Sequence, residues 1–169
     1  SSSTDNSSSI IDGWIKKNKN KLKTRFLNVH EGSTTPSSSK NYGILRATSP
    51  WIAFMDCGLK FQNDWLEAHC KLIKKFPTLK IARGQVNTLG LGIIDISAVC
   101  QTYGYNRLRP CIPSTLVSKD IFEQTGLFIW GRRAGYDAVW TKQTINQKYE
   151  SKINKNVVVK YFKTNFSNS

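Results

Sequence analysis

The stretch that most constrains the fold of this chain is Trp51–Gly58, which reads Trp-Ile-Ala-Phe-Met-Asp-Cys-Gly. Five consecutive apolar residues, Trp51 to Met55, are typical of a buried strand, and a single carboxylate follows them. Open α/β sheets bind ligands at the carboxyl ends of their strands. The pattern therefore predicts a buried central strand that delivers Asp56 to a binding site. The alternative is an ordinary strand end, because Asp and Gly are also common turn residues.

Composition narrows the class of protein. A chain of 169 residues is long enough for one domain with a real core, and an apolar share of 39% excludes wholesale disorder. No apolar run approaches the roughly 18 to 20 residues of a membrane-spanning helix, and the Ser-rich start lacks a signal-peptide pattern. The four cysteines form no CxxC pair, so we interpret them as reduced, mostly buried thiols. We therefore expect a cytoplasmic protein.

The formal charge of +14 predicts attraction to anions. Nucleotides, polyphosphates, nucleic acid and an anionic membrane face are all compatible with this charge. The chain has no aromatic–basic pattern of the kind found in RNA-binding domains and no Cys/His module, so we expect no nucleic-acid partner. A peripheral contact with the anionic inner face of the membrane remains compatible with the charge.

Apolar spacing and turn residues predict an alternation of helices and strands, which indicates an α/β sandwich. Helices are expected from Ile10 onward and over residues 40–47, 65–76, 119–125 and 137–147. His69 is expected to pack on the apolar stripe of the helix over residues 65–76. Strands are expected over residues 26–29, 51–55, 80–86, 114–118 and 156–162. Residues 32–39 are expected to form a loop. Residues 87–113 are expected to form a long irregular segment that shapes the acceptor side of the site.

Six segments of the chain resemble, in the same order, motifs of the family 2 glycosyltransferases. They are residues 1–7 (the family's DDGSTDNS), 40–44 (ARNxGI), 51–58 (EYIAFLDADD), 64–67 (PDWLE), 117–128 (xxRRxxFEEVGGFDE) and 134–140 (GEDxDLW). Each match is short, but chance would have to reproduce the order and the spacing as well as the letters.

The resemblance implies a single GT-A-like glycosyltransferase domain over residues 1–169, with a Rossmann-like, mixed and mainly parallel sheet flanked by helices. The family's first strand would precede Ser1, so the domain is expected to be incomplete at its N-terminus. Members of this family are inverting enzymes, here of the hexosyltransferase type, that transfer a sugar from a nucleotide-diphosphate sugar to a saccharide or lipid-linked acceptor.

The same resemblance assigns residues on the donor side. Asp56 matches the first Asp of the DxD motif, which binds the nucleotide or a divalent cation, Mn or Mg. Lys40 takes the place of the Arg that approaches the diphosphate, and Asp5 and Ser3 lie in the segment that binds the nucleotide. A transferase must neutralise the charge that builds on the leaving diphosphate, which explains the need for cations at this site.

The acceptor side is assigned by the last motif. Asp137 matches the catalytic base that takes the proton of the acceptor hydroxyl. Its alternative role is to cap the helix that follows. Arg132 and Arg133, just upstream, are expected to contact the diphosphate or an acidic acceptor, or else to lie in a solvated loop.

The chain departs from the family's motifs at two positions. Gly58 replaces the second Asp of DxD, which puts direct metal coordination in doubt, and Tyr136 replaces the Glu of GED. These departures keep a second hypothesis open, a non-catalytic relative that binds nucleotide or carbohydrate.

Overall fold

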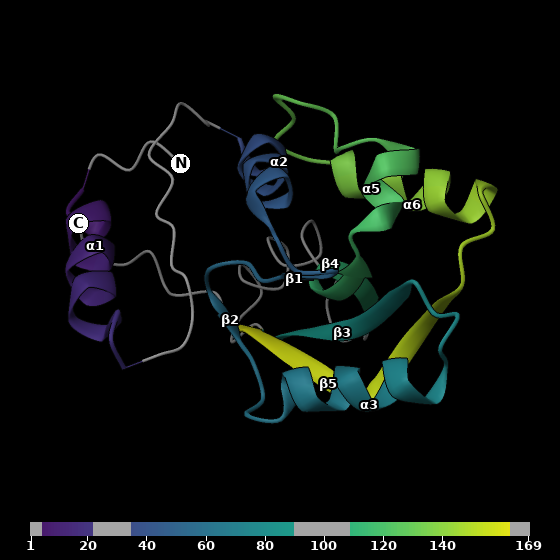
Figure 1. Cartoon of the computed structure of the whole chain (residues 1–169), viewed down its shortest axis with the longest axis horizontal. Coiled ribbons are helices and arrows are strands. Elements are labelled where there is room, and N and C mark those ends of the chain that lie inside the picture. The colour runs from purple at the N-terminus through teal and green to yellow at the C-terminus, as the bar shows by residue number, and fades with distance from the viewer. Residues whose placement is uncertain (1–4, 22–34, 90–108, 163–169) are drawn as a thin grey trace. The chain divides into compact units, whose positions relative to one another are not determined.

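The computed structural model describes residues 5–21, 35–89 and 109–162 (Figure 1). The chain divides into two compact units, one made of residues 1–47 and 127–138, the other of residues 48–126 and 139–169. The strand expected at 26–29, Ser3, and most of the irregular segment expected at 87–113 lie outside the described residues.

The first unit contains helix α1 (Ser7–Asn18), helix α2 (Pro36–Arg46), the segment 127–135 and the first turn of helix α6 (Tyr136–Asn146). The start of α2 corrects the sequence analysis, which placed a loop up to residue 39. Thr35 Oγ1 accepts the N–H of Ser38 at 3.4 Å, and Pro36 occupies the first helical position. Both features favour a helix start, so α2 begins before the predicted residue 40.

The second unit is built on a five-stranded sheet in the order β1-β4-β3-β5-β2. The strands are β1 (Trp51–Phe54), β2 (Leu59–Lys60), β3 (Ile81–Leu89), β4 (Arg109–Ser118) and β5 (Ser151–Phe162). The predicted α/β fold with a mixed sheet is confirmed, but the sheet is not mainly parallel. Among the described strands, only β3 and β5 pair in parallel, whereas β1 with β4, β3 with β4, and β2 with β5 are antiparallel. The helices here connect strands that are not neighbours, so the alternation in the sequence does not set the direction of adjacent strands.

Strand β1 is not the central strand that its apolar run predicts. Within the described sheet it pairs only with β4 and stands at one end of the strand order. Its side chains alternate between buried and less buried positions: Ile52 and Phe54 are buried, while Ala53 and the following Met55 are exposed. Such alternation in burial is typical of a strand with one face covered. A continuous apolar run in the sequence occurs in strands of this kind as well as in strands that are covered on both faces, so the run alone does not distinguish them.

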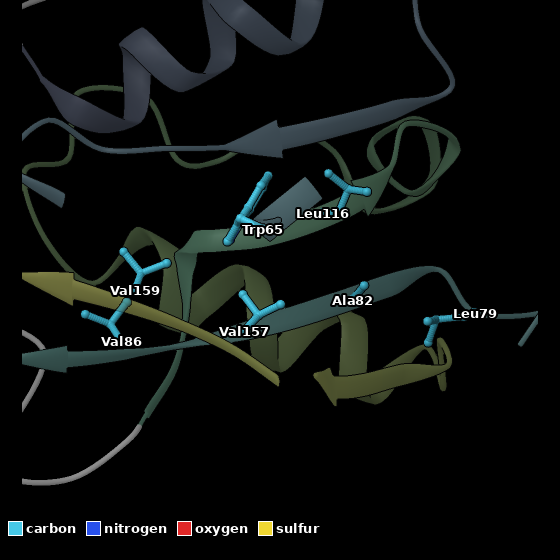
Figure 2. Close-up of a cluster of buried hydrophobic side chains, with 7 residues drawn as sticks. All are labelled: Trp65, Leu79, Ala82, Val86, Leu116, Val157 and Val159. Carbon is cyan, nitrogen blue, oxygen red and sulfur yellow. The ribbon is translucent and has the colours of Figure 1, made fainter. Parts of the chain in front are cut away.

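Helix α3 (Trp65–Lys75) covers one face of the sheet, as the sequence predicts. Figure 2 shows the core on this face, where Trp65 of α3 meets small and branched side chains of three strands and their flanks: Leu79, Ala82, Val86, Leu116, Val157 and Val159. Burial of apolar area of this kind is the main stabilising contribution to a fold.

The other face is covered by the short helix α5 (Asp120–Thr125) and by α6. Phe122 of α5 lies edge-to-face against Phe54 of β1 at 6.1 Å and stacks on Trp140 of α6 at 5.2 Å. Helix α5 ends at Gly126, whose φ of 76° is readily adopted by glycine, so the predicted end of this helix is confirmed.

A bulge interrupts the pairing of β3 with both of its neighbours between Arg83 and Gln85. The residue between them, Gly84, has no room for a side chain. A Cβ there would lie 2.5 Å from the Ser114 carbonyl oxygen and 2.8 Å from Val157 Cγ1, and nearer still to the Ser114 hydroxyl. Gly84 therefore allows β4 and β5 to approach the middle of β3.

No helix in the described part of the chain combines the length and the apolar character needed to cross a membrane.

The expectation of mostly buried thiols is wrong for two of the three described cysteines, since Cys57 and Cys70 are exposed and Cys111 is half-buried. Cys57 is exposed because it lies in the turn after β1, and Cys70 because it lies on the outer side of α3.

Candidate functional site

In the first unit, the segment 127–135 is fastened to α2 by buried polar side chains. The amide of Asn41 donates to the Phe128 carbonyl at 2.8 Å and accepts the Phe128 N–H at 3.0 Å. Near the start of the helix, Ser38 Oγ accepts the N–H of Gly131 at 3.0 Å, and Ser37 Oγ accepts that of Arg132 at 2.9 Å. These bonds fix the backbone of the segment that leads to Asp137.

Aromatic side chains complete this attachment. The ring of Tyr136, the first residue of α6, packs edge-to-face on Phe128 at 5.3 Å, and Lys40 Nζ lies 5.7 Å from the centre of the Tyr136 ring. The position where the family motif has Glu thus holds a buried aromatic ring. Lys40 and the residue before Asp137 are therefore neighbours, which the sequence alone does not reveal.

Asp137 is the second residue of α6 and is half-buried. Its Oδ1 accepts the N–H of Ala138 at 3.0 Å, so its carboxylate lies at the N-terminal end of the helix, where the helix dipole favours negative charge. Asp137 lies inside the first turn of α6, one residue after the helix begins. It is therefore not the N-cap residue of this helix. Arg132 and Arg133 are exposed, as expected for the loop alternative.

Asp5, the other described candidate in this unit, stands before α1. Its Oδ1 accepts the N–H of Ser7 at 3.0 Å, and hydrogen bonds from the Ser7 side chain and backbone hold the pKa of Asp5 below its usual value. This is a local role at a helix start, and nucleotide binding by Asp5 stays a prediction.

Asp56 belongs to the second unit. It follows the end of β1 by two residues and is half-buried, in agreement with its expected place after the strand. Gly58, at the position of the family's second Asp, has a φ of 81° and leads directly into β2. An Asp would adopt this backbone conformation only with strain, so the turn itself favours glycine here.

The described residues show no cluster of side chains that would ligate a metal ion. Within residues 5–21, 35–89 and 109–162 no three His, Cys, Asp or Glu side chains converge to hold one. A cation held at Asp56 would therefore need further ligands, such as the phosphates of a bound nucleotide sugar.

His69 is packed, as predicted for a residue on the apolar stripe of α3. Its ring lies 4.8 Å from that of Trp65 and has no solvent exposure. Burial lowers the pKa of His69 to about 4, an effect that the nearby Ser114 backbone offsets only in part. Neither ring nitrogen has a hydrogen-bond partner among the described residues.

The residues that sequence reasoning missed are those that attach the segment 127–135: Ser37, Ser38 and Asn41. One signal was available, because Asn is a poor residue for the middle of a helix and stands at the Asn of the ARNxGI motif. The two serines lay hidden in a Ser-rich stretch that is typical of a loop.

Comparison with known proteins identifies the family. The sequence matches Glycosyl transferase family 2 over residues 1–89, more than half of the 169 residues. A comparison with curated protein sequences gives no significant match.

Solved structures of TarS from S. aureus share the fold. TarS 1-349 in complex with UDP-GlcNAc superposes with a TM-score of 0.68 at 14% identity, covering 98% of this chain and 48% of that chain. TarS 1-349 in complex with UDP gives a TM-score of 0.65 at 13% identity, covering 96% and 49%. The chain thus spans about half the length of these structures. At such identity the likeness shows the fold alone, and it confirms the predicted GT-A-like architecture. Together with the match over residues 1–89, it leads to one conclusion: the chain belongs to glycosyl transferase family 2.

Proposed function

We propose that this domain transfers a sugar from a nucleotide-diphosphate sugar to a saccharide or glycolipid acceptor, with inversion at the anomeric carbon. The observation that carries the proposal is membership of glycosyl transferase family 2. The crystal structures of TarS in complex with UDP-GlcNAc and UDP make uridine nucleotides the first donors to test. The activity would serve the synthesis of a surface polysaccharide, and the charge of +14 suits an acceptor at an anionic membrane face.

On the donor side, Asp56 would contact the nucleotide, with Asp5 and Ser3 as further nucleotide ligands. Lys40 supplies positive charge for the diphosphate, and Arg132 and Arg133 would contact the diphosphate or an acidic acceptor. Mn or Mg would add to this charge, because such ions are commonly held by one or two carboxylates together with substrate phosphates. Asp56 is the carboxylate that we assign to that purpose.

On the acceptor side, Asp137 would act as the general base. As the acceptor oxygen attacks the anomeric carbon, its proton passes to the Asp137 carboxylate, and the bond between that carbon and the β-phosphate oxygen breaks. The nucleoside diphosphate leaves with the bonding electrons. The positive charge of Lys40 stabilises the charge that develops on it.

A specific observation favours a second candidate function, a binding domain without catalysis. Tyr136, which replaces the motif's Glu, is buried with its ring against Phe128. A domain that has lost this carboxylate and the second Asp of DxD could retain the fold and the binding of nucleotide or carbohydrate alone.

Turnover of UDP-sugars separates the two candidates. Wild-type protein is incubated with UDP-GlcNAc, UDP-glucose and UDP-galactose, with and without Mn. Water takes the place of the acceptor hydroxyl, and the configuration of the released sugar is followed by NMR before it mutarotates. We expect release with inverted configuration, and a rate about 10²- to 10⁴-fold lower in Asp137→Asn. Asp64→Asn, an exposed carboxylate at the start of α3, is the control and should keep the wild-type rate.

Two results would overturn catalysis by Asp137. Retained configuration would contradict the inverting mechanism, and an undiminished rate in Asp137→Asn would remove this residue from the reaction. Binding of UDP without turnover of any donor would establish the second candidate instead.

A further inference from the structure

The segment 127–135 presents an exposed indole on a fixed backbone. Trp130 is 48% exposed and its neighbour Ile129 is 44% exposed. Large apolar side chains scattered singly on a surface need no explanation, but a Trp held in place beside other recognition groups is typical of a binding surface.

The indole is held by contacts on both sides of its backbone position. Phe128 is bound by Asn41, and the N–H groups of Gly131 and Arg132 donate to Ser38 and Ser37 of α2. The Trp130 ring packs edge-to-face on Tyr42 with centroids 5.3 Å apart and an interplanar angle of 81°. The guanidinium of Arg46 in turn lies 5.3 Å from the centre of the Tyr42 ring. The indole is therefore preorganised, and a ligand that stacks on it loses little by ordering it.

Positively charged residues follow Trp130 closely in the sequence. Arg132 and Arg133 follow Trp130 after a single glycine and are exposed, and the segment 127–135 contains no acidic residue. A guanidinium binds carboxylate or phosphate through two parallel hydrogen bonds. The C–H face of a sugar ring carries a small positive charge and packs well on the negative face of an indole.

We propose that Trp130, Arg132 and Arg133 form a subsite for an anionic saccharide, whose sugar ring stacks on the indole while its carboxylate or phosphate pairs with the guanidinium groups. Its role as an acceptor subsite rests on the proposed function. The subsite lies in the same unit as Asp137, four to seven residues before it in the chain. It assigns acceptor recognition to residues outside the donor motifs.

Binding to defined polymers tests the proposal. Affinity electrophoresis at about 0.15 M salt, where the screening length is about 8 Å, compares polygalacturonate, phosphomannan, neutral dextran and inorganic polyphosphate. We expect wild-type protein to bind at least one anionic saccharide more tightly than dextran. Trp130→Ala should weaken that binding about tenfold, as expected for the loss of one aromatic contact, and should leave polyphosphate binding unchanged.

The matched control is Trp14→Ala. Trp14 is equally exposed, at 50%, but lies on α1, and its removal should leave binding of all four polymers unchanged. Binding of polygalacturonate alone would identify a carboxylate as the recognised anion, and binding of phosphomannan alone a phosphate; both support the subsite. Equal binding of dextran, equal losses in the two Trp variants, or no binding of either anionic saccharide would overturn it.

Uridine diphosphate binding by the same variants separates this proposal from the proposed function. Loss of UDP binding in Trp130→Ala would place the indole on the donor side and overturn the subsite. If wild-type protein bound no nucleotide while anionic saccharide binding still depended on Trp130, the proposed transferase would fail and the subsite would stand.

Discussion

Asn41 shows how one buried side chain can organise a loop. It is fully buried in the middle of α2 and satisfies both backbone groups of Phe128, which lies 87 residues further along the chain. Buried backbone groups that lose their partner retain the full cost of desolvation, so this amide contributes more than an exposed hydrogen bond would.

Asn41→Ala is therefore expected to lower the free energy of unfolding by about 2–3 kcal/mol, because the N–H and C=O of Phe128 lose their partners. Urea denaturation followed by circular dichroism measures the change. Asn18→Ala is a matched control, since Asn18 is a half-buried helical Asn whose amide makes a solvent-exposed hydrogen bond to a backbone carbonyl, that of Trp14 at 2.8 Å. Its effect should stay within about 0.5 kcal/mol, and equal effects of the two substitutions would contradict the structural role of Asn41.

His69 makes stability depend on pH in a defined direction. Burial lowers its pKa from 6.5 to about 4, so below pH 6.5 the unfolded chain takes up a proton that the folded chain does not. This contribution to stability is fully present above pH 6.5 and is lost progressively as the pH falls to about 4. The loss should amount to about 3 kcal/mol, from about 1.4 kcal/mol for each unit of pKa shift.

The measurement is the free energy of unfolding between pH 7.5 and 4 for wild-type protein and His69→Phe, which keeps an aromatic ring beside Trp65. We expect the free energy of unfolding of the wild type, relative to that of His69→Phe, to fall by about 3 kcal/mol as the pH is lowered to 4. Parallel profiles would show that His69 titrates normally in the folded state.

At the scale of elements, the bulge of β3 depends on the absence of one side chain. Gly84→Ala should destabilise the fold by about 1–3 kcal/mol or more, because the new Cβ would collide with the backbone of Ser114 and with Val157. Gly43→Ala is the control: a Cβ at Gly43, in α2, meets no atom within 4 Å, and Ala should stabilise that helix by about 0.5–1 kcal/mol. Thermal unfolding of the two variants should give shifts of opposite sign; a Gly84→Ala protein as stable as the wild type would refute the close approach of the strands.

The elements also show what the sequence could and could not predict. Helices α3, α5 and α6 were placed within about a residue of their ends, because each combines apolar spacing with a clear stop or turn residue. Strand β5 begins at Ser151, five residues before the predicted start at Asn156, because its first residues are mostly polar and resemble a loop. Strand β2 was missed, since two residues carry no periodic pattern.

The candidate site was predicted less completely than the fold. Motif resemblance found Asp56, Lys40 and Asp137, and the position of Asp56 after β1 agrees with it. The contact of Lys40 with Tyr136 and the attachment of the segment 127–135 depend on residues far apart in the sequence. No local pattern encodes such contacts. The nucleotide, metal and catalytic roles stay predictions.

At the scale of the whole molecule, the charge of +14 acts on every anionic ligand. Nucleotide and polyanion binding should both weaken as salt rises, because exposed charges are screened beyond about 8 Å at physiological ionic strength. A salt-dependent affinity alone therefore does not identify a site. Variants of single residues at constant salt are needed to separate a specific site from the general field of the protein.

The most direct test of the central claim, a nucleotide-sugar site at Asp56, is a thermal-shift panel of UDP, GDP, CDP and ADP with and without Mn or Mg at constant salt. A ligand at 100 times its dissociation constant stabilises the folded state by about 2.7 kcal/mol, which gives a clear shift of the melting temperature. We predict that one nucleotide, UDP first, stabilises the wild type and Asp64→Ala but not Asp56→Ala. Equal stabilisation by all four nucleotides, or a shift that survives in Asp56→Ala, would contradict the assigned site, and no shift with any nucleotide would contradict the proposed transferase.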